Sequence, residues 1–267
     1  MDRKMYRKAF DNLSFSENFQ ARTEALLRDR AQDMEKEQTM KTCRTTRKTV
    51  MLAAAMAAML AVSVSAAVLW LSPSQVAEHM EEPLLAEAFD SEDAVDINET
   101  AAVGDYTVTL AGLVSGGDLS AVPTEYNGEL ISDRTYAVFT LTRTDGQPLE
   151  EQPEGLAYTP LVGGYHVRAV NAWTLGATCQ PFVQDGTAYY LFDTRNLEMF
   201  ADHPVYFAIY EGSVPSADTF DMKEDGTIAL KEGVTGTLFT LPLDESRADP
   251  EAAEAFVKGT GLEFTQN

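Results

Sequence analysis

Acidic residues recur at metal-ligand spacing in the stretch DMKEDGTIALKE, which runs from Asp221 to Glu232. An EF-hand loop binds calcium through oxygen ligands at its positions 1, 3, 5 and 12 and needs glycine at position 6. Asp225 and Gly226 match positions 5 and 6, but Lys223 places an ammonium group at position 3. The flanking segments favour strands, whereas an EF-hand needs helices. We therefore expect a β-hairpin at Asp225-Gly226 and no metal site.

Residues that could act as a base or a nucleophile are scattered along the chain. The three histidines, His79, His166 and His203, lie far apart, and none belongs to an HExxH pair. The sequence also lacks a G-x-S-x-G motif, a P-loop and a Rossmann glycine pattern. Carboxylates are so abundant that spacing singles out no acid–base pair. We expect a protein that is not an enzyme and that uses no cofactor.

The elements that must position any site begin with an apolar run from Val50 to Leu71, 22 residues without a charge. As a helix this run would measure about 33 Å, which is enough to cross a bilayer. About 49 residues precede it, whereas a secretory signal begins with a short basic region. We expect one transmembrane helix over 50–71. Cleavage after the small residues at 63–67 and a soluble core helix are the alternatives.

Basic residues flank this run on one side only. Lys41, Arg44, Arg47 and Lys48 precede it, and no lysine or arginine follows until Arg134. Because basic residues collect on the cytoplasmic side, we expect the amino terminus inside the cell and the carboxy-terminal domain outside.

The expected membrane divides the charge of the chain. Residues 1–49 hold 12 basic and 8 acidic side chains, net +4, while residues 50–267 hold 8 basic and 34 acidic side chains, net −26. An outer domain with this charge repels nucleic acid and anionic headgroups, so we expect no direct binding to nucleic acid. Cys43 and Cys179 fall on opposite sides, so no disulfide or zinc site is expected.

Small residues recur along one side of the expected span. They lie at i, i+4 spacing, which lets two membrane helices approach closely. A homodimer is therefore a hypothesis, through Ala53, Ala57, Ala61 and Ser65.

The inner segment, 1–49, is expected to form two short cytoplasmic helices. Ser14 and Glu17 make a capping box for the second helix. About 40 residues with few large apolar groups cannot close a core alone, so the apolar stripe meets a partner, the membrane surface, or nothing stable. It either lies on the inner leaflet or docks onto a protein. The predicted partner-binding residues are Phe10, Leu13, Phe15, Phe19, Leu26 and Leu27.

Residues 72–102 are expected to form an acidic stalk. Nine acidic residues lie between Glu78 and Glu99, and Pro73 and Pro83 accompany them without any basic residue. This composition favours an extended or partly helical connector over packed structure.

Short alternating runs characterise residues 103–267. Period-two alternation predicts half-buried strands over 105–114, 135–143, 204–210 and 235–243. Asp-Gly pairs at 145/146, 185/186 and 225/226 predict type I′ hairpin turns. We expect a mainly β outer domain, an antiparallel, immunoglobulin-like sandwich. A short helix should end the chain, with Asp249 as its cap, Pro250 at its first position and Gly259 as its stop.

Four aromatic residues of this domain could either line a pocket or pack in the core. Aromatic residues in strands are usually core residues, so we expect packing. The four are Tyr136, Trp173, Tyr189 and Tyr190.

The whole pattern resembles a group of membrane-anchored, anti-sigma-factor-like regulators of Gram-positive bacteria. The carrying residues are MYRKAFDNLSFSENFQARTEALL, the apolar run, VGDYTVTLAGLVSGGDLS, RTYAVFTLTRTDGQPL, MFADHPVYFAIYEG and LFTLPLDESRADPEAAEAF. The zinc-binding histidine and paired cysteines of the best-known anti-sigma domain are missing. The resemblance implies that an outer β-domain senses or binds something and that the inner helices hold a cytoplasmic sigma factor. The alternative is a surface-displayed binding or structural module with no cytoplasmic partner.

Overall fold

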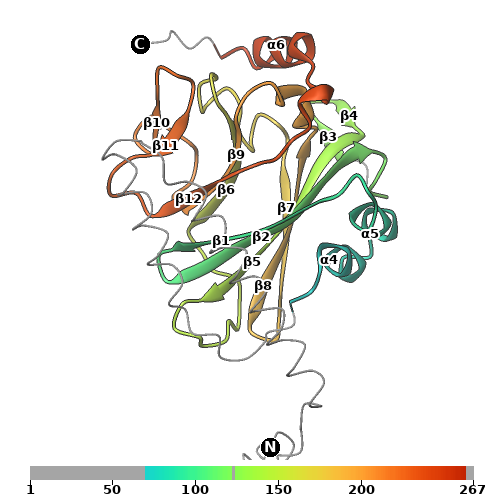
Figure 1. Ribbon diagram of the computed structural model, residues 1–267, viewed down its shortest axis with the longest axis vertical. Coiled ribbons are helices and arrows are strands. Elements are labelled where there is room, and N and C mark those ends of the chain that lie inside the picture. The colour runs from blue at the N-terminus through green and yellow to red at the C-terminus, as the bar shows by residue number, and fades with distance from the viewer. Residues whose placement is uncertain (1–69, 122–123, 263–267) are drawn as a thin grey trace, which may run out of the picture. The chain divides into compact units, whose positions relative to one another are not determined.

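Antiparallel β-sheets make up most of the protein (Figure 1). The structure, a computed structural model, describes residues 70–121 and 124–262. The longer strands are β1 (Val95–Val103), β2 (Tyr106–Gly117), β5 (Asp133–Arg143), β6 (Leu156–Val162), β7 (Thr178–Gln184), β8 (Thr187–Arg195), β9 (Val205–Glu211) and β12 (Gly236–Thr240). Two small hairpins add β3 (Thr124–Tyr126), β4 (Glu129–Ile131), β10 (Phe220–Met222) and β11 (Ile228–Leu230).

Helices are few and short in the described part of the chain. The α-helices are α4 (Pro73–His79), α5 (Pro83–Phe89) and α6 (Pro250–Gly259), and the 3₁₀ turns are η2 (Glu198–Phe200) and η3 (Glu245–Arg247). None of these helices is long and apolar enough to cross a bilayer. The expected cytoplasmic helices, residues 50–69 of the expected span and its small-residue stripe lie outside the described residues. The last two residues of that span, Trp70 and Leu71, are not helical, so the boundary expected at residue 71 is wrong.

The larger sheet has five strands in the order β1-β2-β5-β8-β7. The smaller has three, in the order β12-β9-β6, and every pairing in both sheets is antiparallel. The alternation that predicted strands is visible in β5, where Phe139 faces one side of the sheet and Val138 the other, in two different apolar clusters. The expectation of a mainly antiparallel β domain is confirmed.

The two sheets pack face to face through aromatic side chains. Phe207 of the smaller sheet lies 5.4 Å from Phe139 and 5.0 Å from Phe192 of the larger one, measured between ring centroids. Phe139 also stacks on Tyr190 at 4.6 Å. Such tilted and offset contacts are favourable for aromatic rings in a core.

The acidic stalk expected over 72–102 is wrong. Its residues instead form α4, α5 and β1, and the two helices cover the second face of the five-stranded sheet (Figure 1). Val76, Ala77 and Leu85 are fully buried against that face. The apolar residues recur at helical spacing, and all the acidic residues except the buried Glu82 are exposed. The acidic average of the segment concealed this pattern. We call α4 and α5 the helical layer.

Local sequence explains where the helical layer begins. Ser72 caps α4 in a capping box with Gln75, and Pro73 occupies the first turn. The Leu71 backbone N–H donates to the Tyr189 hydroxyl at 3.3 Å, which ties the chain to β8. Gly112 of β2 makes room here, because a Cβ at that position would lie 2.9 Å from the Val95 carbonyl oxygen and 3.4 Å from the Pro73 ring.

Of the three Asp-Gly turns, one matches its prediction fully. Asp185 and Gly186 both have positive φ, 51° and 79°, and join β7 to β8 as a two-residue hairpin. The 225/226 turn joins β10 to β11, but of its two residues only Gly226 has positive φ, in a longer loop. The 145/146 turn is no hairpin, because β6 belongs to the other sheet.

The carboxy-terminal helix forms as expected. The Asp249 carboxylate accepts the Ala252 N–H at 2.9 Å, and Pro250 occupies the first turn. The helix includes Gly259 and is capped by Thr260, one residue later than predicted.

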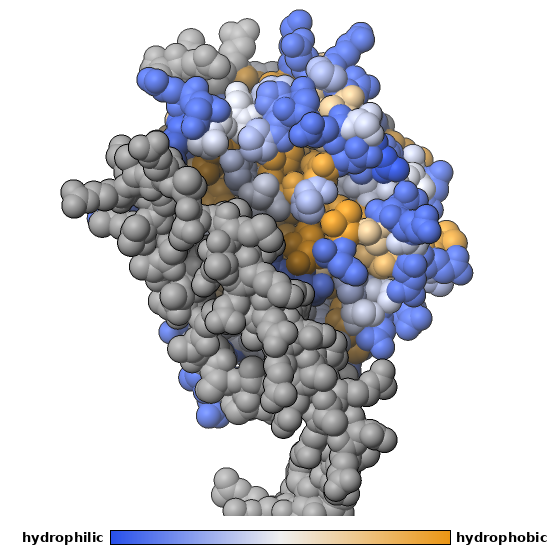
Figure 2. Space-filling view, in the orientation of Figure 1, coloured by the Kyte–Doolittle hydropathy of each residue, from blue (hydrophilic) through white to orange (hydrophobic). Residues whose placement is uncertain are grey.

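The sheet edges are partly protected. β1 and β12, one edge of each sheet, contact each other, while the opposite edges, β6 and β7, carry Pro160 and Pro181. Figure 2 shows that hydrophilic residues form most of the outer rim of the visible face, with hydrophobic residues towards its middle.

Candidate functional site

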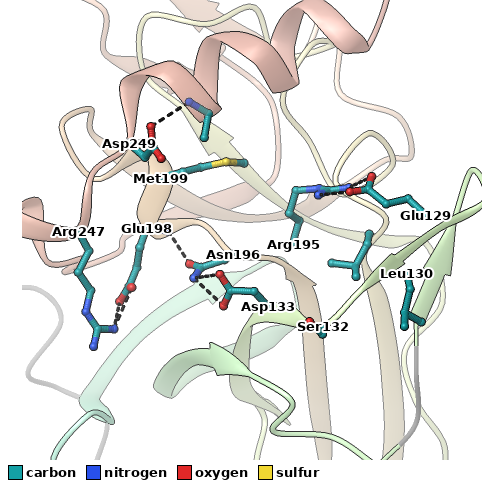
Figure 3. A pocket seen from close by; sticks show the side chains of 12 residues that line it. Glu129, Leu130, Ser132, Asp133, Arg195, Asn196, Glu198, Met199, Arg247 and Asp249 are labelled. Carbon is teal, nitrogen blue, oxygen red and sulfur yellow. Dashed lines mark hydrogen bonds and ion pairs between the residues drawn. The ribbon is translucent and has the colours of Figure 1, made fainter.

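A pocket of about 420 Å³ opens at one end of the five-stranded sheet (Figure 3). Its walls come from β4, the start of β5, the end of β8 with η2, the end of η3 and the start of α6. The chain enters the domain at Leu71, which contacts Tyr189 on β8. Arg195 of the pocket lies six residues further along β8, or roughly 20 Å along a strand, so we call this end of the sheet the far end. The lining residues are Glu129, Leu130, Ile131, Ser132, Asp133, Arg195, Asn196, Glu198, Met199, Arg247, Asp249 and Ala252.

An arginine–carboxylate pair closes one side of the pocket. Arg195 donates through both terminal nitrogens to Glu129, at 2.8 and 3.4 Å. This hydrogen bonding and the charge of Arg195 hold the pKa of the Glu129 carboxyl below its usual range. The Arg195 guanidinium also lies 5.7 Å from the ring centroid of Phe256 on α6, a cation–π contact. The pair therefore joins the β3–β4 hairpin to the end of β8 and the outer helix.

A second pair closes the opposite side (Figure 3). Arg247 donates through one nitrogen to both carboxylate oxygens of Glu198, at 2.9 and 3.0 Å. Its other terminal nitrogen lies 3.6 Å from Asp93. Because Arg247 belongs to η3 and Glu198 to η2, the pair fixes the segment before α6 against the turn after β8.

Asp133 lies between the two pairs (Figure 3). The Asn196 amide nitrogen donates to both of its carboxylate oxygens at 2.9 Å, and the Asn196 backbone N–H donates to the Asp133 carbonyl at 3.2 Å. No ion pair joins Asp133 or Asp249 to any cation in 70–121 and 124–262. The lining thus holds four carboxylates against two guanidinium groups.

A buried ion pair supports the strands just behind the pocket. Arg134 is 2% exposed, and its Nε donates to Asp193 at 3.1 Å. Its Nη2 donates to the Gly176 carbonyl at 3.2 Å, which anchors the loop between β6 and β7. Asp193 also accepts the Thr178 backbone N–H. Arg134 and Arg195 stand directly opposite each other on β5 and β8, so the acidic partners also offset their mutual repulsion.

The loop between β6 and β7 presents an aromatic side chain to solvent. Trp173 is 77% exposed, so the prediction that it packs in the core is wrong, whereas Tyr136, Tyr189 and Tyr190 are buried as expected. The buried Asn171 side chain accepts the Trp173 and Thr174 N–H groups and donates to two carbonyls. This loop holds the indole outward through its backbone rather than through packing.

Among the described residues, no metal-binding cluster lies at the pocket, and no histidine or cysteine lines it. In the described part of the chain, no group of three or more His, Cys, Asp or Glu side chains could hold a metal ion. The three histidines have separate surroundings: His79 stacks on Phe182 at 3.9 Å, His203 contacts Tyr165, and the His166 ring accepts the Arg168 backbone N–H at 3.1 Å. Burial raises the pKa of the Cys179 thiol to about 12, which keeps it protonated.

The predicted partner-binding residues and the pocket are different parts of the protein. Phe10, Leu13, Phe15, Phe19, Leu26 and Leu27 lie outside the described residues, as does Cys43. Sequence reasoning identified none of the pocket residues as a site. Among the pocket residues, the sequence singled out only Asp249, as a helix cap. The signal that could have indicated a site is the group of polar residues Arg195, Asn196 and Glu198 at and just after the end of β8.

Comparison with known proteins places the chain in no family. No family model matches it, and no curated protein or solved structure does.

Proposed function

We propose that the protein is a single-pass membrane regulator, anti-sigma-like, that couples an outer β-domain to a cytoplasmic transcription partner. The observation that carries this proposal is that packed structure of the outer domain begins directly after the expected span, without a flexible linker. The expected membrane span runs into Leu71, whose backbone N–H already bonds the Tyr189 hydroxyl, and α4 is capped at Ser72 with Ser74, Val76 and Ala77 buried. A change in the outer domain would therefore act on the span directly, whereas a flexible stalk would absorb it.

The helical layer supplies the rigid connection that such coupling needs. Its apolar side chains pack against Tyr136, Val138, Tyr189 and Leu191 on the sheet. Packed elements transmit displacement because close-packed interiors are stiff. The far-end pocket lies at the opposite end of the sheet from Leu71, where the chain enters the domain. In a membrane-anchored domain, that opposite end is the one that a ligand would reach. We further propose that the sandwich is immunoglobulin-like.

The inner apolar stripe supports a cytoplasmic protein partner. A tail that only sets topology needs lysine and arginine near the membrane and gains nothing from Phe15 or Phe19. Exposed apolar residues without a partner are a liability, whereas an amphipathic helix in a groove uses a few of them for most of its affinity.

The alternative is a surface-displayed binding module without a cytoplasmic partner. The exposed Trp173 on its hydrogen-bonded loop favours this function, because rigidly held aromatic residues often anchor protein interfaces. This module would use the same outer domain and would leave the inner segment without a partner.

Affinity capture with the full chain in neutral detergent distinguishes the two functions. We expect the wild type to retain a sigma factor and a Phe15→Ala, Phe19→Ala variant to lose it. An Asn18→Ala, Gln20→Ala variant changes neighbouring polar residues of the same expected helix and should retain the partner. If the inner segment binds only lipid, and binds it equally in all variants, the regulator is excluded and the surface module takes its place.

A further inference from the structure

We infer that the far-end pocket binds a cationic peptide, with a lysine ammonium group placed against Asp133. This inference rests on the proposed function, since it names the class of ligand that the outer domain would sense. The cavity, the balance of its charges and the apolar residues beside it carry the argument together (Figure 3).

The charges of the pocket favour a cation over an anion. Both guanidinium groups are already bound by carboxylates, Arg195 by Glu129 and Arg247 by Glu198. An anionic ligand would compete with these carboxylates for the guanidinium groups and would meet two further uncompensated carboxylates, Asp133 and Asp249. Asp133, by contrast, is bound only by a neutral amide among the described residues, and each oxygen keeps a further lone pair. An ammonium group can bind there without breaking an existing ion pair.

The two ion pairs also hold Asp133 in place. They brace the walls from both sides, so the carboxylate meets its ligand in a preorganised position, which lowers the cost of binding. The Asn196 amide orients both oxygens and leaves the negative charge uncompensated.

Apolar residues beside the charge favour a peptide over a simple ion. Leu130 is 64% exposed at the rim, and Met199 and Ala252 contribute to the opposite wall. A pocket of about 420 Å³ falls within the usual size of small-ligand sites and takes one or two side chains. The net charge of −26 beyond residue 49 would in addition concentrate basic ligands near the domain.

The experiment is calorimetric titration of the full chain in neutral detergent at low salt. The probe is the blocked peptide acetyl-Leu-Lys-Lys-Leu-amide, and acetyl-Leu-Glu-Glu-Leu-amide is its charge-reversed control. We expect the lysine peptide to bind and the glutamate peptide not to bind. Asp133→Asn should weaken binding about tenfold, the effect of losing one charge-assisted hydrogen bond. The carboxamide that this substitution introduces could still pair with Asn196, so the fold should survive, and thermal unfolding would verify this.

Asp221→Asn is the matched control, because it removes the same charge from an exposed residue of β10 outside the pocket. It should leave the affinity unchanged. If both variants weakened binding equally, the peptide would be responding to general surface acidity, and the inference would be overturned. If neither variant weakened binding, Asp133 would not contact the peptide, and the inference would be overturned as well. The absence of binding, equal binding of the glutamate peptide, or equal binding of spermidine, which carries ammonium groups without leucine, would also overturn it. These results concern the outer domain only and leave the capture of a sigma factor as a separate test.

Discussion

The helical layer and the far-end pocket both contain many acidic residues, but different interactions hold them in place: apolar burial in the helical layer and ion pairs in the pocket. The helical layer carries its acidic residues on the outside and is fixed by Val76, Ala77 and Leu85 on the inside. The pocket brings its carboxylates together and is fixed by Arg195 and Arg247. In each of its ion pairs one side chain is exposed, Glu129 at 63% and Arg247 at 44%, and the other is mostly covered.

This difference shows that the position of charge matters more than its amount. Apolar burial contributes a large, salt-independent stabilisation, whereas an exposed ion pair contributes about 0–1 kcal/mol. The helical layer should therefore be a permanent part of the fold. The ion pairs of the pocket contribute little to global stability and fix the local position of its walls, so the pocket should be far more sensitive to salt than the helical layer.

The largest expected effect comes from removing the helical layer. Residues 70–267 should fold and remain soluble, because the described residues belong to one compact unit. Residues 103–267, the domain predicted from sequence, lack α4, α5 and β1 and would expose Tyr136, Val138, Tyr189 and Leu191. We expect this shorter chain to aggregate, as measured by size-exclusion chromatography and circular dichroism. A soluble, β-rich monomer of 103–267 would show that the helical layer is dispensable.

A pair of adjacent leucines tests the same packing within the intact domain. Leu85 is fully buried and Leu84 is 51% exposed. Leu85→Ala should lower the free energy of unfolding by about 3 kcal/mol, since it leaves a cavity. Leu84→Ala should change it by less than about 0.5 kcal/mol. Urea unfolding of residues 70–267 measures both, and equal effects would contradict the docked geometry.

Two arginines at the far end separate a buried ion pair from an exposed one. Arg134→Met should cost about 2 kcal/mol, because it leaves Asp193 buried with only its Thr178 contacts. Arg195→Met should cost less than about 1 kcal/mol, because Glu129 is largely exposed and regains water. Urea unfolding again gives the values. If Arg195→Met were the more destabilising, the exposed pair at the pocket would contribute more to global stability than the buried pair behind it.

The smallest expected effect is the pH dependence of the Glu129–Arg195 pair. The pKa of Glu129 is lowered in the folded state, so the pair stabilises the fold above the unfolded pKa of about 4.3, and this contribution is lost as the pH falls through the folded pKa. Carboxyl-carbon NMR of Glu129 should show a titration midpoint that rises in Arg195→Met. An unchanged midpoint would mean that the two residues do not interact in solution.

Much of the β-structure could be predicted from the sequence because alternation reports burial directly. Tyr106, Val108 and Leu110 predicted β2, and Asp249 with Pro250 predicted α6 from local capping alone. Both signals lie within a few residues of the element that they specify.

The helical layer and the pocket depend on information that is not local. The acidic average of 72–102 hid the apolar positions of two seven-residue helices. In the pocket, the residues of each pair are 66, 49 and 63 positions apart, for Arg195–Glu129, Arg247–Glu198 and Asn196–Asp133. No spacing rule reaches so far. The exposure of Trp173 likewise follows from hydrogen bonds to Asn171, which composition does not reveal.

The prolines of the edge strands β6 and β7 affect how copies of the domain behave when they are crowded together. A β-strand at the edge of a sheet is a template on which a neighbouring molecule can extend the sheet. Proline has no N–H to donate, so Pro160 and Pro181 each interrupt the row of donors on β6 and β7, while β1 and β12 shield each other. Many copies of this domain could thus crowd together without merging into fibrils.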